Sequence, residues 1–129
     1  MVHHSLAGVT TLTPQELGAL GEQIAVGHLE SLGLRILQRN WRCRYGELDV
    51  IAADDAHTVV FVEVKTRTGD GFGGLEYAVT PQKVRRLRRL AALWLAEQHA
   101  GWPNLRIDVV GVRLGRSRTP EVMHLRGVG

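Results

Sequence analysis

The sequence predicts a single α/β domain in which helices flank a mixed β-sheet of about five strands. Two segments show the 3.6-residue apolar period of amphipathic helices, and five shorter segments are apolar runs or alternate between apolar and polar residues. In chain order they read helix, three strands, helix and two strands, which is typical of a layered α/β domain. At 129 residues the chain is long enough for one such domain and too short for two ordinary ones.

Both predicted helices begin at a Thr-Pro pair. In "TPQE", Thr13 is placed to cap the helix, Pro14 suits its first turn and Glu16 completes a capping box. This helix is expected to end at Gly33, with an apolar face made of Leu17, Leu20, Ile24, Leu29 and Leu32. The second helix is predicted to begin at "TPQK" and to end near Gly101. Residues 1–12 have no apolar period and are expected to be a flexible leader to a domain spanning 13–129.

The second and third strands are predicted to form an antiparallel hairpin centred on Ala56. Opposed residues then have numbers that sum to 112, because the pairing in such a hairpin is fixed by its turn. One face is apolar and should be the core; it holds Leu48, Val50, Ala52, Val60, Val62 and Val64. The other face pairs Asp49 with Glu63, and Glu47 with Lys65.

These charged residues lie where a central strand would bury them. Two carboxylates opposed across strands, here Asp49 and Glu63, repel each other unless a positive group lies between them. Mg²⁺ or Mn²⁺ suits two carboxylates plus substrate phosphates, and Lys65 is placed to orient or deprotonate a water. The pattern predicts metal-dependent hydrolysis of a phosphodiester. An ordinary solvated polar face is the alternative, and Glu47 is the expected ion-pair partner of Lys65.

Five segments carry a resemblance to a known family: "LGALGEQIAVGHLESLGLRILQRNWR", "GELDVIA", "VVFVEVKTRTGDGFGG", "AVTPQKVRRLRRLAALWL" and "RIDVVGV". From about Leu17 to Val112 the chain resembles the YraN-like bacterial proteins of uncharacterised protein family 0102. These belong to the restriction-endonuclease-like, or PD-(D/E)xK, nuclease superfamily and are similar in layout to archaeal Holliday junction resolvases. The resemblance implies a restriction-endonuclease-like three-layer domain and a DNA endonuclease, with branched or structured DNA as a candidate substrate.

The resemblance also implies roles for individual residues. Asp49 and Glu63, with the backbone carbonyl of Val64, match the metal ligands of the superfamily, and Lys65 matches its catalytic lysine. Glu22, in "LGEQIA", matches a helical glutamate that reaches the ion through water. A leucine precedes Asp49 where the superfamily's name has proline, which weakens the signature but leaves the ligand in place.

Basic residues on both sides of this motif indicate a nucleic-acid partner. The second helix carries five cations without an intervening acid: Lys83, Arg85, Arg86, Arg88 and Arg89. Gln82 and Lys83 open that helix, where free backbone amides favour a phosphate. Arg42 and Arg44, interleaved with Trp41 and Tyr45, precede the motif, and Arg67 follows it. The glycine-rich loop at 69–74, with Phe72, is expected to be a lip over the substrate.

Composition and charge limit the classes of protein to which the chain can belong. The net charge of +3 permits a polyanion such as DNA, no apolar run is long enough for a membrane helix, and no secretory signal is visible. A single cysteine, Cys43, fits a reducing cytoplasm. Two alternatives stay open: a DNA-binding module that keeps the nuclease fold without hydrolysis, and a hydrolase of small phosphorylated molecules. The resemblance to junction-cutting proteins, which need two active sites, also implies a homodimer.

Overall fold

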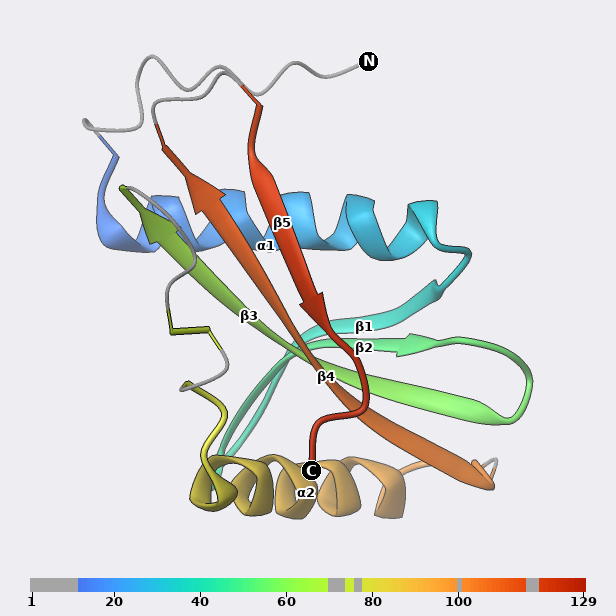
Figure 1. Cartoon of the computed structure of the whole chain (residues 1–129). Coiled ribbons are helices and arrows are strands. Elements are labelled where there is room, and N and C mark those ends of the chain that lie inside the picture. The colour runs from blue at the N-terminus through green and yellow to red at the C-terminus, as the bar shows by residue number, and fades with distance from the viewer. Residues whose placement is uncertain (1–11, 70–73, 76–77, 100, 116–118) are drawn as a thin grey trace.

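A five-stranded mixed sheet forms the middle layer of the molecule, with one helix on each face (Figure 1). The computed structural model describes residues 12–69, 74–75, 78–99, 101–115 and 119–129. Its elements are α1 (Pro14–Ser31), β1 (Arg35–Cys43), β2 (Gly46–Ala53), β3 (Thr58–Thr68), α2 (Pro81–Ala96), β4 (Asn104–Leu114) and β5 (Glu121–Leu125). The strands follow one another in the order β1-β2-β3-β4-β5. Only β3 and β4, joined through α2, pair in parallel, so the predicted three-layer α/β architecture is confirmed.

Local signals fix the ends of α1. The capping box is formed: Thr13 Oγ1 accepts from the Glu16 N–H at 3.1 Å, and Glu16 Oε1 accepts from the Thr13 N–H at 3.0 Å. At the other end Gly33 has a φ of +89°, and the Leu34 N–H donates to the Leu29 carbonyl. This is the Schellman arrangement, which needs a residue that tolerates the left-handed conformation.

The sheet separates two apolar cores. Helix α1 covers one face, and its buried cluster includes Ala25, Leu29, Val50, Ala52, Val60, Val62 and Val110. Helix α2 covers the other, where the cluster includes Trp41, Leu48, Ile51, Phe61, Leu87, Leu90 and Trp94. The prediction that Leu32 belongs to the core is wrong: it is 51% exposed, because it caps α1 beyond the last full turn.

Helix α2 ends at Ala96, five residues before the predicted end at Gly101. The backbone N–H of Gln98 bonds to the Leu95 carbonyl, and its side-chain amide donates to the Trp94 carbonyl at 3.1 Å. These bonds satisfy carbonyls that a longer helix would have used, so the chain leaves the helix early.

Helix α1 approaches β3 closely at Gly21. A Cβ atom built there would lie 1.9 Å from Oγ1 and 2.8 Å from Cβ of Thr66. Gly21→Ala is therefore expected to lower the free energy of unfolding by about 1–3 kcal/mol, the usual cost of overpacking. Urea denaturation checks this value. Gly18→Ala is the matched control, since nothing lies within 4 Å of its added Cβ; that variant should be neutral or more stable by up to about 1 kcal/mol. Equal effects of the two substitutions would contradict the close contact.

Two predictions fall on residues outside this description. The leader proposed for 1–12 is described only at Leu12, and the lip proposed around Phe72 lies in the gap at 70–73. Neither of the described helices is long and apolar enough to cross a membrane.

Candidate active site

The hairpin register is confirmed at its turn end and changes at Asp49. Pairs run from Val50–Val62 to Ala53–Val59, as predicted, but the described pairing stops there. The direct pairing of Asp49 with Glu63 is therefore wrong. Instead Oδ2 of Asp49 accepts a hydrogen bond of 2.8 Å from the backbone N–H of Val64. The carboxylate takes the place of a strand partner at the point where β2 and β3 separate.

A break in the alternation of β2 explains the change. Leu48 packs in the α2-side core, whereas Val50 packs in the α1-side core, although two residues apart on a regular strand share a face. Across β1, Asn40 lies between the pairs Arg39–Val50 and Trp41–Leu48 and has a φ of +54°. The predicted placement of Leu48 on one apolar face with Val50 is thus wrong, and Asp49 turns toward α1.

Glu22 and Asp49 meet in an open cleft between α1 and β3. The cleft has a volume of about 390 Å³, and its lining includes Val64 and Thr66. Oε1 of Glu22 accepts from Arg39 Nε and Asn40 Nδ2, both at 3.0 Å. Sequence analysis missed these two partners, which hold Glu22 in place. The structure brings Glu22 beside Asp49, as the resemblance implies.

The environment of Asp49 opposes its ionised form. Burial raises the pKa of Asp49, the hydrogen bond from the Val64 N–H lowers it, and the nearby carboxylates of Glu63, Glu22 and Glu47 raise it; the net result is a pKa of about 6. A carboxylate in such surroundings is stabilised when a proton or a cation neutralises its charge.

Glu63 is held from the α2 side. Nζ of Lys83 lies 3.0 Å from its Oε2, and Nη2 of Arg86 lies 3.7 Å from its Oε1. Oε2 is nevertheless buried without a hydrogen-bond partner in the part of the chain that the structure describes, because Lys83 is not in hydrogen-bonding geometry. Contact with the Lys83 amine, and then burial, lower the pKa of Lys65. The helix thus places two cations against the candidate acidic centre.

These residues have the chemistry of a hard-cation site. Within the described ranges, no group of three or more His, Cys, Asp or Glu side chains is arranged to hold a metal. Mg²⁺, however, is usually bound by one or two carboxylates plus waters and phosphates. The raised pKa of Asp49 fits such an ion, whereas Oε2 of Glu63 would exchange its ion pair with Lys83 for the metal. Val64, the predicted carbonyl ligand, is in contact with Asp49 through its N–H.

The other predicted basic residues divide between two surfaces. Gln82, Lys83 and Arg86 line an open hollow of about 440 Å³ at the start of α2. Arg85 lies away from it, beside the C-terminal Gly129. The exposed Arg67 is near the end of β3.

Around the β1–β2 turn, Arg44 lies 5.2 Å from the ring centre of Tyr45. Nε of Arg42 lies 3.0 Å from Oε2 of Glu47, its direct partner across β1 and β2. The predicted pairing of Glu47 with Lys65 is therefore wrong, because the neighbouring strand supplies a closer cation.

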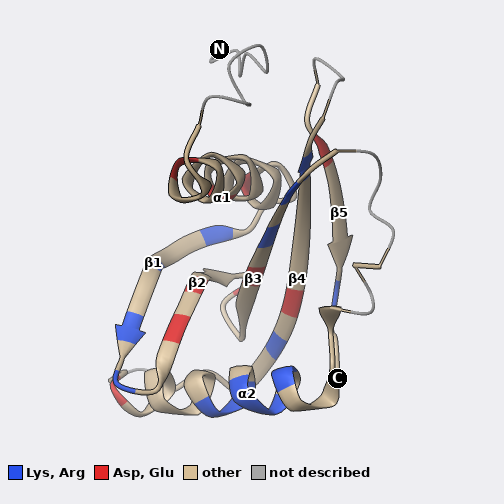
Figure 2. Cartoon of the chain, turned by 90° about the vertical axis from the view of Figure 1, so that its left-hand side faces the viewer, with Lys and Arg blue, Asp and Glu red and all other residues tan. Residues whose placement is uncertain are grey.

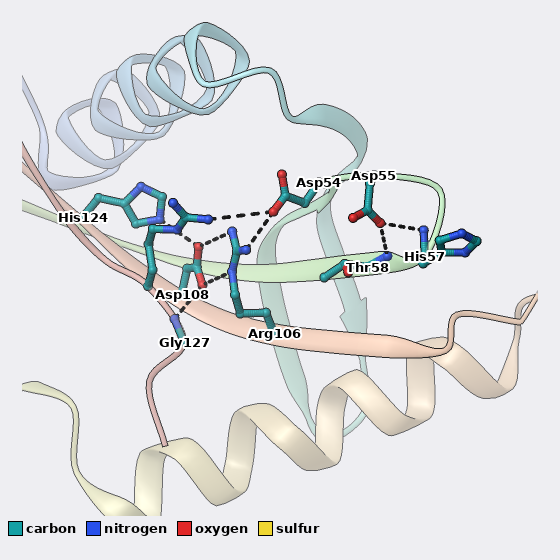
Figure 3. Close-up of polar contacts among 9 residues, drawn as sticks. Asp54, Asp55, His57, Thr58, Arg106, Asp108, His124 and Gly127 are labelled. Carbon is teal, nitrogen blue, oxygen red and sulfur yellow. Dashed lines mark hydrogen bonds and ion pairs between the residues drawn. The ribbon is translucent and has the colours of Figure 1, made fainter.

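Asp108, whose role the sequence leaves open, is a buried structural partner (Figure 3). Its carboxylate accepts from Arg106 Nε at 2.9 Å, His124 Nε2 at 2.8 Å and the Gly127 N–H at 3.0 Å. Burial alone would raise the pKa of Asp108, but the bonds from His124 and Arg106 together hold it below its usual value. Arg106 also reaches Asp54 at 2.8 Å, so the network ties β4 to β5 and to the β2–β3 hairpin.

Comparison with known proteins identifies the family. The model of "Uncharacterised protein family UPF0102" matches residues 21–112. The chain is 72% identical to a UPF0102 protein of Mycolicibacterium smegmatis, over 95% of this chain and 99% of the relative. It is 70% identical to a UPF0102 protein of Mycobacterium avium (93% and 94%) and 71% identical to one of Mycobacterium marinum (92% and 98%). The chain belongs to uncharacterised protein family UPF0102.

Proposed function

We propose that this protein is a metal-dependent nuclease that binds DNA and hydrolyses its phosphodiester bonds at the Asp49–Glu63–Lys65 site. One observation carries the proposal. Burial and the carboxylates of Glu63, Glu22 and Glu47 disfavour the charge of Asp49, and Oε2 of Glu63 has no hydrogen-bond partner among the described residues although Lys83 Nζ lies 3.0 Å away. Asp108, which has a structural role, accepts hydrogen bonds from Arg106, His124 and Gly127. Asp49 accepts one from the Val64 N–H, and Lys83 meets Oε2 of Glu63 outside hydrogen-bonding geometry, so both carboxylates could still take a cation.

Each side chain has a role in this proposal. Asp49 and Glu63 would hold Mg²⁺ or Mn²⁺ with the backbone of Val64, and the bound ion would activate water and offset charge on the phosphate. Lys65 would orient the attacking water. Glu22, fixed by Arg39 and Asn40, borders the cleft that Asp49 lines and would support Asp49 through water.

The phosphate side of the site is basic. Lys83 and Arg86 face Glu63 and also line the hollow at the start of α2, together with Gln82. A phosphate entering this hollow would meet two cations at the positive end of the helix dipole, although the Lys83 and Val84 N–H groups already bond to Thr80. Lys83 and Arg86 are the ion-pair partners of Glu63. When a metal ion binds Glu63 in their place, the two cations would be released to contact the phosphate.

One observation favours a second candidate function, a nucleic-acid-binding module without hydrolysis. Glu63 lies against Lys83 and Arg86, and Asp49 bonds to backbone, so neither carboxylate depends on a metal to have a partner. Calorimetry with Mg²⁺ separates the two. A nuclease should bind the ion at a site lost in Asp49→Asn, whereas a binding module should bind none there.

Lys65→Ala tests the catalytic proposal. Cleavage of labelled DNA in Mn²⁺ should fall by about 10²–10⁴-fold, the range expected for loss of a group that assists proton transfer. Binding of the same DNA, measured by fluorescence anisotropy, should change little. Arg35→Gln, which removes an exposed cation at the far end of β1, is the control and should keep its cleavage rate. Full cleavage by Lys65→Ala would remove Lys65 from the site.

A further inference from the structure

Three cations on α2 form a row that leads from the candidate site to an exposed tyrosine. Lys83, Arg86 and Arg89 are three residues apart and therefore lie along one stripe of the helix. Lys83 and Arg86 contact Glu63, and the guanidinium carbon of Arg89 lies 4.4 Å from the ring centre of Tyr45. At 1.5 Å per residue the row is about 9 Å long. Figure 2 shows the basic side of α2 and the basic end of β1 at the same end of the molecule.

Tyr45 is unusual among the aromatic residues that the structure describes because it is 47% exposed. Trp41, on the same strand end, is buried in the α2-side core and donates to Glu97, which removes it as the stacking residue expected from the sequence. Two guanidinium groups lie over the Tyr45 ring: that of Arg89, 4.4 Å from the ring centre, and that of the exposed Arg44, 5.2 Å from it. Because a cation–π contact occupies a face of the ring, a base that stacks on Tyr45 would displace the more distant Arg44 group.

The turn that carries Tyr45 is fixed against α2. Gly46, the next residue, has a φ of +147°, and a Cβ there would lie 3.3 Å from Cδ1 of Leu90. The packing of this turn against α2 therefore fixes the position of the Tyr45 ring, and Arg44 and Arg89 beside it supply positive charge. An exposed aromatic flanked by arginines is the arrangement on which unpaired nucleic-acid bases stack.

We propose that Tyr45 stacks on an unpaired base of the DNA whose phosphates follow the row Lys83–Arg86–Arg89. The proposal rests on the function proposed above and narrows its substrate class. In a continuous duplex the bases are already stacked inside the helix and cannot reach an aromatic ring on the protein surface. The preferred substrate is therefore DNA with unpaired nucleotides close to the phosphate at the Asp49–Glu63 site, such as a single strand or a branch.

The test measures binding without metal, so that it does not depend on cleavage. Fluorescence anisotropy in EDTA compares one short single strand with a blunt duplex of the same sequence. The wild-type protein should bind the single strand more tightly, and Tyr45→Ala should weaken that binding about tenfold, within the range for loss of one base–aromatic stack. Duplex binding should change less than about twofold in the same variant. Tyr45→Phe, which keeps the ring, should keep the preference.

Two further readouts separate stacking from charge. A single strand carrying 2-aminopurine should lose fluorescence on binding to the wild type and to Tyr45→Phe, but not to Tyr45→Ala. Arg89→Gln should lower the slope of affinity against salt by about one for both DNA forms. Leu105→Ala, at an exposed apolar residue of β4, is the control for the loss of exposed apolar surface and should leave binding unchanged.

Each failure has its own meaning. If both DNA forms bind and Tyr45→Ala weakens them equally or not at all, the stacking role is overturned while the nuclease proposal stands. If neither form binds, or if polyglutamate binds as well as DNA, the nucleic-acid surface itself is overturned, and with it the function on which the inference rests.

Discussion

Asp49→Asn is expected to abolish DNA cleavage and, at the same time, to stabilise the fold. If Asp49 is the metal ligand proposed above, its replacement should lower the cleavage rate by more than the roughly 10–100-fold that loss of a ligand's outer partner usually costs. The loss of activity should therefore exceed about a hundredfold. The gain in stability follows from the buried, repelled carboxylate, which the amide replaces without charge while its oxygen can still accept from the Val64 N–H.

The sign of this effect can be worked out from the pKa of Asp49. The value is raised from 3.8 to about 6, so between these two pH values the folded protein binds more protons at Asp49 than the unfolded chain does. The contribution of Asp49 to stability therefore falls as the pH rises through this window. Above it the penalty is on the order of 2 kcal/mol, after an allowance for partial exposure to solvent.

Urea denaturation of the two proteins in EDTA at several pH values measures this difference. The free energies of unfolding of the wild type and Asp49→Asn should be nearly equal around pH 4. Above pH 6 the variant should have the larger value. Added Mg²⁺ should stabilise the wild type and not the variant, because the ion binds only the folded site. Asp55→Asn is the control: Asp55 is exposed and caps the β2–β3 turn by accepting from the N–H groups of His57 and Thr58, so its loss should not stabilise. A variant of Asp49 that is less stable than the wild type at neutral pH would contradict the account.

Asp108→Ala should produce the largest loss of stability, about 3–5 kcal/mol, because it leaves Arg106 without its buried partner. The change also removes the acceptor for His124, whose other ring nitrogen lies 3.0 Å from His28 on α1. One substitution thus weakens the attachment of β5 and its tail to both β4 and α1. Urea denaturation followed by near-ultraviolet circular dichroism measures the loss.

A double variant shows whether the unpaired charge is the cause. Arg106→Met with Asp108→Leu replaces the ion pair by apolar groups and should recover part of the stability lost in Asp108→Ala. Folded Asp108→Ala should still cleave DNA below its melting temperature, since Asp108 belongs to the network on β4 and β5 and not to the Asp49 cleft. If Asp108→Ala lowers the free energy of unfolding by less than about 1 kcal/mol, the Asp108 network contributes little to stability.

Most of the fold could be predicted because its signals are local. The Thr13 and Thr80 caps lie within four residues of the groups they bind, and Gly33 ends α1 through its own backbone conformation. The register from Val50–Val62 to Ala53–Val59 follows from the centre of a single turn. The shared cleft of Glu22 and Asp49 agrees with the family resemblance, whereas the direct Asp49–Glu63 pairing expected from the hairpin is not formed.

What sequence reasoning missed depends on contacts between distant elements. The left-handed Asn40 on β1 turns Asp49 and Leu48 to faces that strict alternation would not allow. The contact of Lys83 with Glu63 depends on how α2 packs over β3. His28 and His124 are 96 residues apart, and no pattern within either segment indicates that they meet.

The most direct test of the central claim is cleavage of labelled duplex, single-stranded, flap and four-way-junction DNA in Mg²⁺ or Mn²⁺ by the wild type, Asp49→Asn and Asp55→Asn. The wild type and Asp55→Asn should cut at least one substrate with unpaired nucleotides, and Asp49→Asn should cut none while binding all that the wild type binds. Cleavage by Asp49→Asn at the wild-type rate, or no cleavage of any DNA by the wild type with either metal, would contradict that claim.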